Sequence, residues 1–179
     1  RKTAMKLFGL LGLLMLLSCG YADRHRNNSS CEQVLVDSLE VRVQDSLFSN
    51  VHYSRSQVLD ALTQAQDSQV YYRLLALYGK TFFVSSDFDS ILYYNRRVKE
   101  FSRNASQSSE SLQSPQWNDV LSDVYNIEGN VWMQLNRPDS AITDYKKAYE
   151  YRLKGKKLHL LPDICINTAD AYLHRSDLA

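Results

Sequence analysis

The chain has few residues that break helices, with six glycines and three prolines among 179 residues. This scarcity favours long helices, because glycine and proline are the residues that helix interiors tolerate least. No apolar run reaches the roughly 20 residues that a membrane-spanning helix needs. The formal net charge is only +1, and no block of lysine and arginine suits the tracking of phosphates. The composition therefore argues against a nucleic-acid-binding protein. Tyrosine is abundant instead, with twelve copies that suit helices packed by large side chains.

Catalytic and metal-binding motifs are also missing. The four histidines are scattered, no cysteine pair has metal-ligand spacing, and no Gly-rich phosphate loop or Gly-x-Ser-x-Gly elbow is present. Several aspartates precede a serine, a pair that suits the first turn of a helix. We therefore predict that the chain is not an enzyme and that it needs no metal and no cofactor.

The N-terminal segment has the order of a secretory signal peptide. Lys2 and Lys6 give a positive start, residues 7–17 are apolar, and the small Ser18 precedes Cys19. Eleven apolar residues are too few to span a bilayer. Removal of the segment before Cys19 leaves 161 residues, enough for one domain, and changes the formal charge from +1 to −2. We predict that residues 1–18 are a signal peptide.

With a cysteine in that place, the segment resembles a bacterial lipoprotein signal with its lipobox. The resemblance implies cleavage between Ser18 and Cys19, a diacylglycerol on the Cys19 thiol, and acylation of the new amino group. Each buried CH₂ of an acyl chain contributes about 0.8 kcal/mol, so two or three chains hold a soluble domain on a bilayer. The expected location is the cell envelope, on the periplasmic or surface side of the inner or outer membrane. An ordinary signal peptide with a chance cysteine is the alternative.

The segment after the signal divides into a tether and two helices. Residues 19–30 are polar and lack an apolar period, which predicts a flexible tether. Residues 31–66 are expected to form two N-terminal capping helices, with an interruption at residues 50–56. The apolar positions that predict the two helices are Leu35, Leu39, Val43 and Leu47 in the first and Val58, Leu59 and Leu62 in the second.

An internal repeat follows. Gly79 and Gly129 each precede, by ten residues, a block with Asp-Ser, apolar residues at two places and a basic pair in register, at 89–98 and 139–148. A third copy begins near Ala169, and the given sequence ends where the second helix of that copy is expected. The predicted helices cover about 70–84, 87–102, 116–135, 138–157 and 162–175.

Each copy has the properties of a helical hairpin. A glycine or alanine on the first helix allows the second helix to approach closely, and an aromatic residue three positions later fills the space between them. Pro138 suits the first position of a helix. The aromatic residues in question are Phe82, Trp132 and Tyr172.

The order of small residue, aromatic, turn, alanine, aromatic and alanine resembles the tetratricopeptide repeat. The likeness is best over 122–153, weaker over 72–101 and partial over 162–179, and the spacings of 50 and 40 residues exceed the usual 34. The family's proline at the end of the second helix is absent. The resemblance implies an all-α fold, a right-handed solenoid of helical hairpins over 67–179 whose last repeat is incomplete. Such irregular, Tyr-rich repeats behind a lipobox are similar to those of tetratricopeptide lipoproteins from the Bacteroidetes.

In a hairpin solenoid the first helix of each hairpin lines the concave side. In peptide-binding members of the family, asparagine and lysine on that side bond the backbone or carboxylate of an extended peptide. The resemblance therefore implies a membrane-anchored scaffold that binds a protein or peptide. The candidate binding residues are Arg73, Lys80, Asn126, Asn130 and Asp170, with Cys19 as the lipid attachment site. The alternative is that these candidate residues are ordinary solvated polar residues with no binding role.

Two other functions stay open at this stage. Repeats of this style occur in the sensing part of larger bacterial regulators of the histidine kinase or helix-turn-helix type, and in lipoproteins that capture glycans. Cys165, between two isoleucines, is expected to be a buried free thiol. A disulfide between Cys31 and Cys165 is the alternative.

Overall fold

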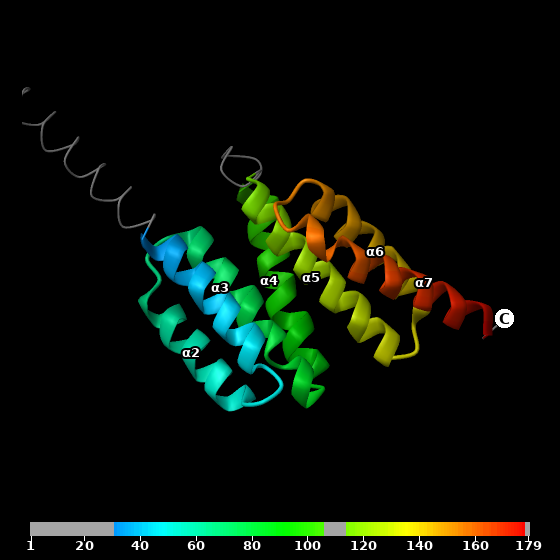
Figure 1. The fold of residues 1–179 in the computed structure, drawn as a ribbon, viewed down its shortest axis with the longest axis horizontal. Helices are drawn as coiled ribbons and strands as arrows, with labels where there is room; N and C mark the ends of the chain where they lie inside the picture. Colours follow the sequence, from blue (N-terminus) through cyan, green and yellow to red (C-terminus); the bar gives the residue numbers. More distant parts are fainter. Residues whose placement is uncertain (1–30, 106–113, 178–179) are drawn as a thin grey trace, which may run out of the picture.

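The computed structural model describes residues 31–105 and 114–177, and every regular element in these segments is helical. The predicted all-α class is confirmed. Figure 1 shows the labelled helices following one another across the molecule in chain order. The elements are a helix at 31–46, α2 (Val51–Gln64), α3 (Ser68–Lys80), the 3₁₀ turn η1 (Phe83–Ser85), α4 (Phe88–Ala105), α5 (Pro115–Gln134), α6 (Pro138–Leu153), the 3₁₀ turn η3 (Leu158–Leu160) and α7 (Leu161–Asp177).

Side-chain caps fix where several helices begin. The Asn50 side chain accepts from the backbone N–H of Tyr53 at 3.1 Å, and Asp67 caps α3 in the same way. Such caps satisfy N–H groups that have no partner within the helix. The predicted interruption is present but lies at 47–50 and not at 50–56, because Asn50 caps α2 and the helix resumes at Val51. Pro138 occupies the start of α6 as expected.

Helix α6 ends four residues earlier than predicted. Its last residue is Leu153, whereas the sequence predicted a helix from 138 to about 157. A turn and the 3₁₀ element η3 follow before α7. The long spacing between the last two repeat copies therefore comes from a longer connection between α6 and α7 and not from a longer helix.

Two glycines bring paired helices into close contact, as the sequence predicted. A Cβ added at Gly79 in α3 would lie 3.0 Å from the Cβ of Tyr94 in α4. A Cβ added at Gly129 in α5 would lie 2.8 Å from Cζ of Tyr145 in α6, inside normal contact distance. Helices α3 and α4 thus form one hairpin, and α5 and α6 form another.

The helix at 31–46 and α2 form an additional hairpin, and the buried positions of its second helix match those of the other two hairpins. The fourth residue of each second helix is fully buried, at Ser54 in α2, Ile91 in α4 and Ala141 in α6. The Ser54 hydroxyl is 2.8 Å from that of Ser46 on the paired helix. The sequence had assigned 31–66 only as capping helices. Its expected apolar face was also wrong at Leu35, which is exposed while its neighbour Val36 is buried.

Three apolar clusters run along the array. The N-terminal core joins the helix at 31–46 to α2 and α3, the central core joins α3 and α4 to α5, and the C-terminal core joins α6 to α7. Trp117 lies in the central core, where its indole N–H donates to Ser102 at 3.0 Å. First helices also touch one another, since α3 contacts α5 and α5 contacts α7.

Candidate functional site

The structure places Arg73 in the interior. The sequence analysis expected it on the open side of α3, but its side chain is 7% exposed. The guanidinium donates to Asp37 at 2.7 Å and to Glu40 at 2.8 Å, both on the helix at 31–46, and also to Gln33. Arg73 therefore joins two first helices. Its two terminal nitrogens have acceptors within the chain, whereas Nε is buried without a hydrogen-bond partner among the described residues.

Lys80 and Asn126 are also bonded to neighbouring helices. The Lys80 ammonium donates to Oε1 of Gln44 at 2.6 Å. The Asn126 carbonyl oxygen accepts from the side chain of Asn167 in α7 at 3.1 Å. Each bond links the first helices of successive hairpins. A ligand at either residue would compete with these bonds.

Asn130 and Asp170 lie close to one tyrosine. The Tyr145 hydroxyl donates to Oδ1 of Asn130 at 2.7 Å. Burial raises the pKa of Tyr145, and the negative charge of Asp170 raises it further. Asp170 itself is exposed. Of the five predicted binding residues, Asp170 is the most open to solvent, while Asn130 bonds its own hairpin.

A buried ion pair secures the connection after α6. Arg152 is 1% exposed and donates to Asp119 at 2.8 Å and to Asp123, both on α5. Asp119 also accepts from the backbone N–H groups of the two residues after Gly155, at 2.9 and 3.2 Å. A Cβ at Gly155 would lie 2.8 Å from Cγ of Asp119, so this turn fits closely only around glycine.

Glu40 connects that turn to the N-terminal hairpin. Its carboxylate accepts from Lys157 at 2.9 Å and from Arg73 at 2.8 Å. Burial lowers the pKa of Lys157, but the carboxylates of Glu40, Asp123 and Asp119 together outweigh this effect and raise the pKa overall. We call Asp37, Glu40, Arg73, Asp119, Asp123, Arg152 and Lys157 the ion network. It runs from the helix at 31–46 over α3 and α5 to the end of α6 and the turn that follows α6.

A second polar group lies over α5. Lys99 donates to Glu128 at 2.6 Å, and Lys99 and Lys147 each lie 5.1 Å from the ring of Tyr125. Burial raises the pKa of Glu128 although Lys99 lowers it in part. Burial, together with Tyr151 and nearby carboxylates, raises the pKa of Tyr125 to about 12. Both groups therefore favour their neutral forms more than they do in water.

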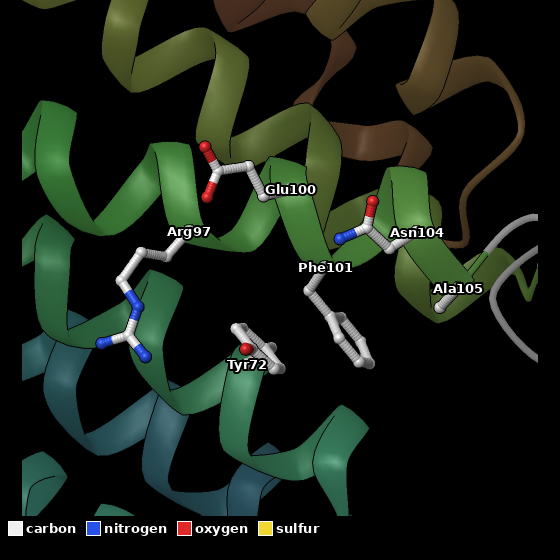
Figure 2. Close-up of a pocket in the computed structure, with 6 residues that line it drawn as sticks. All are labelled: Tyr72, Arg97, Glu100, Phe101, Asn104 and Ala105. Carbon is white, nitrogen blue, oxygen red and sulfur yellow. The ribbon is translucent and has the colours of Figure 1, made fainter.

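An open depression of about 400 Å³ lies between α3 and α4. Figure 2 shows Arg97, Glu100 and Asn104 along α4, with the rings of Tyr72 and Phe101 beside them. The two rings are stacked, with centroids 4.0 Å apart and planes 10° apart. The rings therefore use one face each to pack the helices together. The depression offers one guanidinium, one carboxylate and one amide to a polar ligand.

The cysteines differ from the expectation. Cys31 and Cys165 are both free and exposed, so the predicted burial of Cys165 is wrong and the alternative disulfide is not formed. Cys165 faces outward because α7 buries the side that carries Ile164 and Ala171. The predicted lipid attachment site, Cys19, lies outside the described residues.

The described residues give no sign of metal chemistry. Within 31–105 and 114–177, no three histidine, cysteine, aspartate or glutamate side chains are grouped so that they could hold a metal ion. In the same segments no helix is long and apolar enough to cross a membrane.

Sequence reasoning missed the ion network. Residues as far apart as Glu40 and Lys157 contact each other only because the helices stack, and no local pattern signals such a pair. The additional first hairpin did leave a signal. Ser54, Val58 and Ala61 have the same spacing as Ala141, Tyr145 and Ala148 in α6.

We compared the chain with protein-family models, curated proteins and solved structures. None of the three comparisons found a match.

Proposed function

We propose that the chain is a lipid-anchored scaffold of tetratricopeptide-type hairpins that binds a protein or peptide partner. The observation that carries the proposal is the shared register of three hairpins, in which Ser54, Ile91 and Ala141 occupy equivalent buried positions. Stacked hairpins bury a continuous core and leave long rows of polar side chains on each side. Such surfaces suit extended partners better than small substrates.

The proposed binding surface lies on the concave side of the array, on the first helices α5 and α7. Arg73 and Lys80 are bonded within the chain, whereas Asp170 is exposed and Asn126 and Asn130 are half-buried. Asn126 and Asn130 lie one helical turn apart on α5 and can exchange their present bonds for bonds to a peptide backbone. The exposed carboxylate of Asp170 favours a partner with positive charge nearby.

Photo-crosslinking in cells tests this proposal. A photoreactive amino acid replaces Asn126 in one variant, and in a control it replaces Lys146, an exposed residue on the second helix α6. We expect a defined crosslinked partner at position 126 and none at position 146. Absence of a crosslink at 126, or the same products at both positions, would contradict the proposal.

A further inference from the structure

The helix at 31–46 has apolar side chains on two opposite sides. One side packs Leu39 into the N-terminal core. Val34 and Val41 are seven residues apart and, at 3.6 residues per turn, lie on the side turned away from that core. They are 65% and 62% exposed, and Phe48, in the turn that follows the helix, is 75% exposed. We call Val34, Val41 and Phe48 the outer stripe.

A helix with apolar residues on both sides is normally covered on both. The described part of the chain leaves the outer stripe open. We propose that the outer stripe lies on the surface of the bilayer that holds the acylated Cys19. This inference rests on the lipid anchor of the proposed function and adds a second, non-covalent contact with the same membrane.

The length of the tether supports a bilayer as the occupant. Eleven residues, 20–30, separate Cys19 from the helix. A chain extends by at most about 3.3–3.6 Å per residue, so the helix begins within roughly 40 Å of the anchored cysteine. The bilayer is then the nearest apolar phase. Because the lipid anchor keeps the helix near the bilayer, the contact between the outer stripe and the bilayer is effectively intramolecular. Even weak apolar binding is then enough to maintain the contact.

The positions and charges of the residues around the outer stripe indicate how the helix would lie on the bilayer and which lipids it would contact. Seven-residue spacing keeps Val34 and Val41 in a line along the helix, as in helices that lie parallel to the membrane plane, and Phe48 lies in the turn just beyond the helix end. The charged neighbours are Asp37 and Asp45, both exposed, and Arg42. A helix without a basic face gains nothing from anionic lipids. The contact is therefore apolar and suits zwitterionic lipids.

A fluorescent label at the stripe tests the proposal. The full chain carries Cys31→Ser and Cys165→Ser, its Cys19 acylation is verified by mass spectrometry, and Val41→Cys takes an environment-sensitive label. The matched control places the label at Leu173→Cys in α7, a position that is 64% exposed. With phosphatidylcholine vesicles we expect a severalfold rise in emission at position 41, quenched by nitroxide lipids, and no change at position 173.

Other outcomes would overturn the proposal. Equal signals at positions 41 and 173 in acylated protein would exclude docking while leaving the anchor intact. A concentration-dependent rise at position 41 without vesicles would show that a second copy covers the stripe. A Cys19 without acyl chains would overturn both the anchor and the docking, and mass spectrometry distinguishes this case. With the label at 41, Phe48→Ser should lower the vesicle signal if the proposal is right.

Discussion

The close approach of α5 and α6 at Gly129 predicts that Gly129→Ala destabilises the protein. A Cβ at this position would lie 2.5 Å from Cδ1 and 2.8 Å from Cζ of Tyr145. The Tyr145 ring is 2% exposed, and its hydroxyl donates to Asn130 at 2.7 Å. The ring cannot move away without losing packing and this hydrogen bond. Gly129→Ala should therefore force the two helices apart.

The expected magnitude follows from two opposing effects. Overpacking a well-filled core costs about 1–3 kcal/mol. Alanine is more favourable than glycine in a helix interior by about 1 kcal/mol. Because the Tyr145 ring is held in place, the overpacking cost should lie at the upper end of its range. We therefore expect Gly129→Ala to lower the free energy of unfolding by about 2 kcal/mol, this cost less the helix gain. Urea unfolding followed by far-ultraviolet circular dichroism measures this difference.

Two further variants test whether the contact with the Tyr145 ring causes the loss of stability. Gly79→Ala should cost less, because its Cβ would meet Tyr94 at 3.0 Å and a small shift relieves the contact. Adding Tyr145→Leu to Gly129→Ala removes the ring that clashes, so the two substitutions should show a favourable coupling. A Gly129→Ala protein as stable as the wild type, or more stable, would refute the close approach.

Three other predictions use the polar groups and the thiols. Arg152→Met leaves Asp119 buried without its cation and should cost about 3–5 kcal/mol in urea unfolding; a loss below about 1 kcal/mol, the range of exposed pairs, would contradict the buried ion pair. Burial raises the pKa of Glu128, so the ionised carboxylate is disfavoured in the folded state. The free energy of unfolding should therefore fall as the pH rises from the usual glutamate pKa, about 4.3, through the raised pKa of Glu128. The stability of wild type relative to Glu128→Gln should therefore decrease across that window, and a constant difference would refute the raised pKa. Cys165 should react with a thiol reagent at native conditions as fast as an unfolded thiol, whereas a reaction limited by unfolding would mean that it is buried.

The hairpins could be predicted from sequence because their signals are local. Gly79 and Gly129 each stand where a second helix must approach, and Pro138 marks the start of a helix. The structure confirms the two close approaches and the start of α6. The all-α class follows from the same periodicity and from the scarcity of helix breakers.

The remaining features depend on contacts between distant segments. No local pattern predicts that Arg73 is buried, because its partners Asp37 and Glu40 lie on another hairpin. The early end of α6 depends on the turn that Asp119 holds, about 37 residues away in the chain. The exposure of Cys165 depends on which side α7 turns toward α6. Local apolar patterns contain none of this information.

The claim on which the account most depends is that Cys19 joins a helical-repeat domain to a membrane. Metabolic labelling of cells with a tagged fatty acid tests it directly, with the full chain compared with its Cys19→Ala variant. A lipid anchor on Cys19 predicts label on the wild-type protein and none on the variant. Equal labelling of both proteins, or no labelling of either, would contradict it.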